Sequence, residues 1–133
     1  MHLKGKRVAV TGAGGFIGSH LIEGILEAGA EVKAFVHYNS RGNWGLLELL
    51  PSDVLDSIEV VVGDIQDPFS VRNLVSGCDL VYHLAALIGI PYSYVAPQSY
   101  IATNVNGTLN VLEACRYDRV GRVIHTSTSE TYG

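Results

Sequence analysis

The protein has 133 residues, a length that suits one domain with a single hydrophobic core. Apolar residues make up 47% of the chain and charged residues 17%, which excludes a disordered chain and a collagen-like repeat. The net charge of −4 and the lack of an apolar run near the roughly 20 residues of a membrane span argue against nucleic acid and membrane as partners.

Short apolar runs alternate with longer amphipathic segments along the chain. The run Arg7–Thr11 predicts a buried strand, and the helical spacing in Phe16–Ala28 predicts a helix that ends at Gly29. Asp67 before Pro68 predicts an N-cap followed by a first-turn proline. The further predicted elements are strands at Glu31–Val36, Ser57–Gly63, Asp79–Leu84 and Arg122–Thr126, helical turns within Trp44–Leu50, and helices at Pro68–Ser76 and Pro97–Tyr117.

Strands that alternate with helices predict right-handed βαβ crossovers and a parallel sheet covered on both faces. The apolar run Val60–Val62 fits a strand buried on both sides. The sequence therefore predicts an α/β fold of three layers across residues 1–133, a Rossmann-type doubly wound parallel sheet with strand order 3-2-1-4-5. The segments Asn39–Asp56 and Ile88–Pro97 are predicted as an irregular connection and a loop.

Three glycines recur at intervals of three directly after the first predicted strand: Gly12, Gly15 and Gly18. Such glycines permit a tight turn, a close approach of backbone N–H groups to a pyrophosphate, and close packing of the helix on the sheet. A purely structural turn is the alternative, but the position between a strand and a helix favours a dinucleotide site. Phe16 and Ile17 are assigned to the same site.

The segment Thr11–Gly18 (TGAGGFIG) resembles the glycine motif of the extended short-chain dehydrogenase/reductase superfamily, which includes NAD(P)-dependent nucleotide-sugar epimerases and dehydratases. Four further segments match that pattern in order: Gly63–Ile65, His83–Ala86, Asn104–Thr108 and Thr126–Gly133. The resemblance covers the whole chain. It implies NAD or NADP as the cofactor and a nucleotide-diphosphate sugar as the substrate.

The resemblance also assigns individual residues to the cofactor. Asp64 and Ile65 are expected at the adenine, Leu84, Ala85 and Ala86 on the phosphate and ribose side, and Asn104 in the long helix. His83, which precedes these residues, is expected to be a hydrogen-bonded strand histidine rather than a catalytic group.

The end of the second predicted strand carries no Asp or Glu, the residues that bind the ribose of NAD and repel a 2′-phosphate. His37, Ser40 and Arg41 could instead accept a phosphate, and Asn39 is assigned to the same site. Arg41 as a solvated loop residue is the alternative. Because relatives with neutral residues here also use NAD, the cofactor is left as NAD or NADP.

The chemistry that the resemblance implies is a transient oxidation at C4 of the sugar, in which a tyrosine beside a lysine removes the hydroxyl proton. Counting back from Tyr132 assigns the assisting hydroxyl to Thr128. Thr128, Ser129 and Glu130 resemble the triad of GDP-mannose-type 4,6-dehydratases, with Glu130 removing the C5 proton and Ser129 at the substrate. An epimerase is the alternative, and Glu130 as a surface residue is another.

The tyrosine and lysine of that chemistry belong to a Tyr-x-x-x-Lys motif that the chain lacks, since its lysines are Lys4, Lys6 and Lys33. In the family this motif follows the Thr-x-Glu segment. We therefore expect the N-terminal part of a longer enzyme, without its substrate lobe and inactive alone. A non-catalytic dinucleotide-binding module is the alternative from another class.

The remaining assignments concern the loop, the long helix and the cysteines. Ser93 is a substrate candidate, and no residue cluster has metal-ligand spacing. The apolar surface of Pro97–Tyr117 predicts a homodimer through this helix, with burial against the sheet alone as the alternative. Cys78 and Cys115 lie in apolar surroundings and no signal peptide is apparent, so we expect reduced thiols and a cytoplasmic protein, with a disulfide as the alternative.

Overall fold

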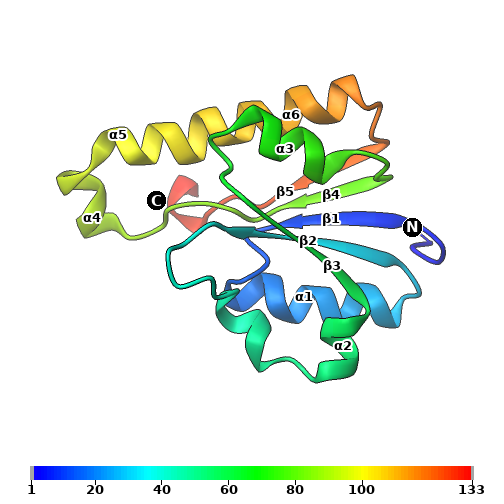
Figure 1. Cartoon of the computed structure of the whole chain (residues 1–133). Helices are drawn as coiled ribbons and strands as arrows, with labels where there is room; N and C mark the ends of the chain where they lie inside the picture. Colours follow the sequence, from blue (N-terminus) through cyan, green and yellow to red (C-terminus); the bar gives the residue numbers. More distant parts are fainter. Residues whose placement is uncertain (1, 133) are drawn as a thin grey trace.

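The computed structural model describes residues 2–132 (Figure 1). Met1 and Gly133 lie outside the described residues, and so does the last position of the Thr126–Gly133 motif. Five parallel strands form one sheet in the order β3-β2-β1-β4-β5, as predicted. The strands are β1 (Arg7–Thr11), β2 (Glu31–His37), β3 (Ile58–Gly63), β4 (Leu80–His83) and β5 (Arg122–His125).

Helices cover both faces of this sheet, which confirms the three layers (Figure 1). One face carries α1 (Phe16–Glu27), with the short elements η1 (Gly45–Leu49) and α2 (Ser52–Asp56) nearby, and the other carries α3 (Pro68–Val75) and α6 (Gly107–Tyr117). The remaining elements are α4 (Ile90–Val95), α5 (Pro97–Tyr100), η2 (Ile101–Asn106) and η3 (Ser129–Tyr132).

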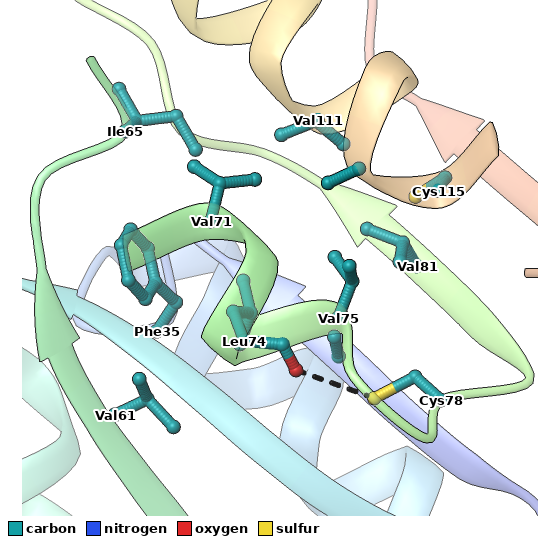
Figure 2. Packing of buried hydrophobic residues seen from close by; sticks show 12 residues of the cluster. Phe35, Val61, Ile65, Val71, Leu74, Val75, Cys78, Val81, Val111 and Cys115 are labelled. Atoms are coloured by element: carbon teal, nitrogen blue, oxygen red, sulfur yellow. Dashed lines mark hydrogen bonds between the residues drawn. The ribbon is translucent and has the colours of Figure 1, made fainter. Parts of the chain in front are cut away.

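Two hydrophobic clusters form because successive strand residues point to opposite faces. Ala9 of β1 joins the cluster beneath α3 and α6, whereas its neighbours Val8 and Val10 join the cluster beneath α1. Figure 2 shows the first cluster, in which Val71 and Leu74 of α3 pack with residues of the sheet and of α6. The central strands β2, β1 and β4 are thus buried on both faces, as their apolar residues predict. The prediction for Val60–Val62 is wrong: Val61 is buried, but Val62 is 50% exposed, because β3 lies at the edge of the sheet.

The start of α3 confirms the predicted cap. The Asp67 carboxylate accepts hydrogen bonds from the backbone N–H groups of Phe69 and Ser70, each at 3.1 Å, and from the Ser70 hydroxyl at 2.6 Å. These bonds, the Ser70 hydroxyl foremost, lower the pKa of Asp67. Pro68 occupies the first turn, where its missing N–H has no helical partner to lose.

A buried lysine completes the other end of α3. Lys33 of β2 is only 7% exposed, and its Nζ donates to the carbonyl oxygens of Asn73 at 3.0 Å and Ser76 at 3.5 Å. The Glu59 carboxylate lies 3.7 Å from the same ammonium. A cation at a helix C-terminus is favourable because the last carbonyl groups lack helical partners.

Three segments differ from the sequence prediction. The predicted loop Ile88–Pro97 is wrong in its centre, because α4 forms there with a proline in its first turn. The irregular connection Asn39–Asp56 contains α2 besides the predicted turns near Leu47. Both helices are too short to show a helical period in the sequence. The predicted helix Pro97–Tyr117 forms throughout, but its part Ile101–Asn106 is a π-helix.

Candidate functional site

A cleft of about 1450 Å³ lies at the carboxyl ends of the strands. In open α/β sheets this edge is where ligands bind. The cleft brings together sixteen of the predicted site residues: Gly12, Gly15, Phe16, Ile17, Gly18, His37, Asp64, Ile65, Leu84, Ala85, Ala86, Ser93, Asn104, Thr128, Ser129 and Glu130. The predicted residues Asn39, Ser40 and Arg41 are not among those that line it.

The glycine turn between β1 and α1 leaves no room for a side chain at Gly12 or Gly18. Gly12 has a φ of +68°, a conformation that favours glycine, and a Cβ there would lie 2.9 Å from the backbone N of Ala85. A Cβ at Gly18 would lie 2.3 Å from the carbonyl oxygen of Gly12. The turn is therefore packed backbone against backbone, both within itself and against the end of β4.

The N-terminus of α1 opens into the cleft from this turn. Gly15 is the N-cap residue and has no side chain with which to cap the helix, and no acidic residue lies in the first turn. The first N–H groups of a helix lack intrahelical partners and carry partial positive charge. This helix end can therefore receive an anionic group such as a phosphate.

The glycine turn also contacts the segment after β2. The backbone N–H of Leu46 donates to the carbonyl oxygen of Gly14 at 2.9 Å, and a Cβ at Gly14 would lie 2.6 Å from the carbonyl oxygen of Trp44. Gly45 has a φ of +65° and approaches Gly14 equally closely. These contacts connect η1 to the turn.

The side-chain amide of Asn39 forms hydrogen bonds within the loop between His37 and Asn43. Asn39 Nδ2 donates to the carbonyl oxygen of Asn43 at 2.8 Å, while its Oδ1 accepts from the backbone N–H of Arg41 at 3.1 Å. The Asn39 side chain thus bonds to its own loop. Of this predicted ribose-side group, only His37 lines the cleft.

The loop after β4 is fixed to the long helix. The backbone N–H of Leu87 donates to Asn104 Oδ1 at 2.8 Å, and Asn104 Nδ2 donates to the carbonyl oxygen of Leu87 at 2.9 Å. The Tyr100 hydroxyl donates to the carbonyl oxygen of Gly89. Asn104 therefore holds the loop as well as lining the cleft, and its predicted contact with a cofactor stays a prediction.

His83 is a buried, hydrogen-bonded histidine at the end of β4, as the sequence predicts. It is 2% exposed, and its ring contacts the hydroxyl groups of Thr11 at 2.8 Å and Thr108 at 3.0 Å. Burial and, to a smaller extent, the neighbouring His125 lower the pKa of His83 to about 4. The imidazole is therefore neutral at physiological pH.

The three predicted reaction residues follow β5 and line the far part of the cleft. Thr128, Ser129 and Glu130 are exposed, and the backbone N–H of Glu130 donates to Thr128 Oγ1 at 3.3 Å. Several polar residues of the cleft had no site role predicted from the sequence. Thr126, Ser127 and Thr108 lie within matched motifs, whereas His125, Gln66 and Thr103 do not. The rule that ligands bind at the carboxyl ends of parallel strands indicates His125, Thr126 and Ser127.

Both cysteines are free and buried in the first cluster (Figure 2). Burial raises the pKa of Cys78 and of Cys115 to about 11. Between residues 2 and 132, no group of three or more His, Cys, Asp or Glu side chains could hold a metal ion. No helix in that same range is both long and apolar enough to cross a membrane.

Comparison with known proteins identifies the family. The family description GDP-mannose 4,6 dehydratase matches residues 9–133. The chain belongs to this family. The match confirms the resemblance to the nucleotide-sugar dehydratases and epimerases of the extended short-chain dehydrogenase/reductase superfamily.

Curated relatives include enzymes of more than one activity. The chain is 38% identical over 122 residues to a 2-alkyl-3-oxoalkanoate reductase of Stenotrophomonas maltophilia. The matched segment is 92% of this chain and 33% of the relative. It is 36% identical over 133 residues to a dTDP-glucose 4,6-dehydratase of Streptomyces niveus, covering 96% of the chain and 39% of the relative. The chain thus spans well under half the length of these relatives.

Solved structures of the same fold include nucleotide-sugar complexes. The structure of MoeE5 in complex with UDP-glucose and NAD matches 96% of this chain and 38% of its own, with 34% identity and a TM-score of 0.77. A UDP-N-acetylglucosamine 4-epimerase from Methanobrevibacter ruminantium M1 matches 98% of this chain and 40% of its own, with 31% identity and a TM-score of 0.84.

Proposed function

We propose that the chain is the NAD(P)-binding part of a nucleotide-diphosphate-sugar 4,6-dehydratase that acts by transient oxidation at C4 of the sugar. The observation that carries the proposal is the continuous cleft, which runs from the glycine turn at Gly12–Gly18 to the segment Thr128–Glu130. The family match and the dehydratase relatives support the same conclusion.

In this proposal the N–H groups at the start of α1 bind the pyrophosphate of the dinucleotide, because no side chain or acidic residue competes for them. Asp64 and Ile65 lie at the adenine end, and Leu84, Ala85 and Ala86 line the phosphate and ribose side. The bound nicotinamide supplies the hydride acceptor. NAD and NADP stay alternatives, since the end of β2 carries His37 in place of a carboxylate.

The residues after β5 act on the sugar. The Thr128 hydroxyl hydrogen bonds the C4 oxygen, Ser129 and Ser93 contact the substrate, and the Glu130 carboxylate removes the C5 proton so that water leaves C6. The base that takes the C4 hydroxyl proton is a tyrosine with a nearby lysine, and this chain has no Tyr-x-x-x-Lys motif. We therefore expect cofactor binding without turnover from these 133 residues.

Calorimetric titration with NADH and NADPH tests the cofactor site. Gly15→Asp places a carboxylate at the N-cap, where aspartate is favourable to the helix but repels a pyrophosphate. Gly24→Asp, at an exposed position of the same helix, is the matched control. We expect Gly15→Asp to weaken binding by about tenfold or more while Gly24→Asp binds normally; equal binding by both variants, or none by the original chain, would contradict the proposed site.

A 4-epimerase is the second candidate, favoured by the similarity to the archaeal epimerase structure. Glu130 separates the two, because only dehydration needs an acid or base at C5. In a chimera that joins this chain to the remainder of the dTDP-glucose 4,6-dehydratase relative, Glu130→Gln should abolish dehydration but leave C4 oxidation. Unchanged turnover would favour the epimerase. Mass spectrometry of the products distinguishes these outcomes, and turnover by the chain alone would refute the predicted inactivity.

We also propose that the protein forms a homodimer and is located in the cytoplasm. Four exposed apolar residues, Ile101, Val105, Leu109 and Leu112, recur at helical spacing along η2 and α6 and support a homodimer through this helix. Sedimentation equilibrium tests it: Leu109→Glu should give monomers, whereas Leu49→Glu on η1, at an even more exposed position, should not. The buried free thiols support a cytoplasmic location.

A further inference from the structure

A continuous row of hydrogen bonds crosses the base of the cleft, and we call it the histidine chain. Thr11 Oγ1 lies 2.8 Å from His83 Nδ1, His83 Nε2 lies 3.0 Å from Thr108 Oγ1, and Thr108 Oγ1 donates to the carbonyl oxygen of Asn104 at 2.7 Å. The chain joins the end of β1 to the end of β4 and to the long helix. Its members come from three separate segments of the sequence.

The direction of every proton in the histidine chain follows from Thr11. Its Oγ1 accepts the backbone N–H groups of Leu84 at 3.0 Å and Ala85 at 3.1 Å. A hydroxyl oxygen has two lone pairs, so both are in use and the Thr11 proton points to His83 Nδ1. His83 therefore carries its single proton on Nε2 and donates it to Thr108, whose own proton goes to Asn104.

Protonation of His83 would break this order. A proton on Nδ1 would point at the Thr11 oxygen, which has no free lone pair, and one of the bonds to Leu84 or Ala85 would be lost. The titratable group that faces His83 is His125 of β5, with ring centroids 5.2 Å apart, and the contacts from β1 and α6 are uncharged hydroxyls. No carboxylate is among the groups that shift its pKa, so nothing stabilises an imidazolium there.

The histidine chain connects the two walls of the cleft. Thr11 directly precedes the glycine turn, and the N–H groups that it accepts belong to the first residues after β4. Asn104, at the other end, uses its amide to hold Leu87 further along the same loop. The π-helix matters here because Asn104 lies within it, and such turns are frequent at functional sites.

We propose that His83 is a positioning residue, which as the neutral Nε2–H tautomer fixes the loop after β4 against the glycine turn and so sets the shape of the dinucleotide cleft. The inference rests on the proposed cofactor site for its binding readout only. The tautomer itself is independent of any ligand.

The first test is the nitrogen NMR spectrum of the chain labelled with ¹⁵N-histidine. At neutral pH we expect His83 Nδ1 to resonate as an unprotonated nitrogen and Nε2 as a protonated one. A spectrum of the opposite tautomer, or one averaged between the two, would overturn the proposal. This result does not depend on whether NADH or NADPH binds.

The second test uses an almost isosteric pair at the far end of the ring. Thr108→Val removes the acceptor of His83 Nε2–H, whereas Thr108→Ser keeps the hydroxyl. We expect Thr108→Val to change the His83 nitrogen spectrum and to weaken NADH or NADPH binding by about tenfold, and Thr108→Ser to restore both. Weakened binding with an unchanged His83 spectrum would overturn the positioning role.

A further variant keeps the test decisive if Thr108→Val does not fold. His83→Asn retains an acceptor near the place of Nδ1, lacks the Nε2 donor and cannot be protonated. We expect His83→Asn to weaken NADH or NADPH binding at pH 7 by about tenfold, because Thr108 loses the Nε2–H donor that links it to the end of β4. An affinity equal to that of the original chain would overturn the proposal. Failure of the original chain to bind either cofactor would refute the proposed function and leave the tautomer result standing.

Discussion

Two glycines of α1 provide a sharp test of how closely the helix packs on the glycine turn. Both Gly18 and Gly24 lie inside the helix, so alanine gains a similar helix propensity at either position. A Cβ at Gly24 meets no described atom within 4 Å, whereas one at Gly18 lies 2.3 Å from the carbonyl oxygen of Gly12 and 2.8 Å from Ala13 Cα. The same substitution therefore meets open space at one position and backbone at the other.

The magnitude follows from these distances. At Gly24, alanine should raise the free energy of unfolding by about 0.5–1 kcal/mol. At Gly18, ordinary contact begins near 3.4 Å, so α1 must move by about 1 Å from the turn, with an overpacking cost of about 1–3 kcal/mol against the same gain. We expect Gly18→Ala to be about 1–2 kcal/mol less stable than the original chain and Gly24→Ala more stable.

Urea unfolding followed by circular dichroism measures both variants against the original chain. The two midpoints should move in opposite directions, and NADH or NADPH binding should weaken only in Gly18→Ala, because the shift moves the N–H groups at the start of α1. Equal stability of the two alanine variants would refute the inference that the turn leaves no room for a side chain. A normal affinity in Gly18→Ala would refute its link to the cleft.

Three further predictions concern buried groups. The pKa of His83 is about 4 in the folded chain and near 6.5 in the unfolded chain, so the unfolded chain binds more protons between these two pH values. The free energy of unfolding should therefore fall by about 2 kcal/mol from pH 7 to pH 5. In urea titrations, His83→Asn should remove most of that loss. The raised pKa values of Cys78 and Cys115 predict that Ellman's reagent modifies them slowly without urea and rapidly in it; fast modification of the native chain would contradict their burial. Lys33→Met should cost about 1–3 kcal/mol in thermal unfolding because it leaves carbonyls of α3 without a donor, whereas Lys4→Met at the surface should change little.

The strands and the first helix are predictable because their signals are local. Arg7–Thr11 is a short run rich in β-branched residues that Gly12 follows, and its predicted bounds match β1 at both ends. Asp67 and Pro68 determine the start of α3 through bonds within one helical turn. The bounds of β1 and the start of α3 therefore follow from residues that are close together in the sequence.

Structural features that depend on contacts between distant segments could not be predicted from the sequence. Lys33 occurs in a strand pattern, and its partner Asn73 lies 40 residues further on, so no local pattern indicates a buried ammonium. The π-helix lies in a segment that tertiary bonds from Asn104 to Leu87 tie to another part of the chain. In the candidate site, the motif residues were predicted from the resemblance, and His83 was predicted to be hydrogen-bonded. Its partners Thr11 and Thr108, and the hydrogen bonds of Asn39 within its loop, are evident only in the structure.

The contact between Gly14 and Gly45 has a consequence for how such proteins can diversify. A Cβ at Gly45 would lie 2.6 Å from the carbonyl oxygen of Gly14, a Cβ at Gly14 would lie 2.6 Å from the carbonyl oxygen of Trp44, and Leu46 bonds directly to Gly14. The chain after β2 is therefore anchored again at η1, before it continues to β3. Insertions, deletions and substitutions between His37 and Trp44 can therefore be absorbed without displacing the glycine turn, so this loop can vary while the fold around it stays constant.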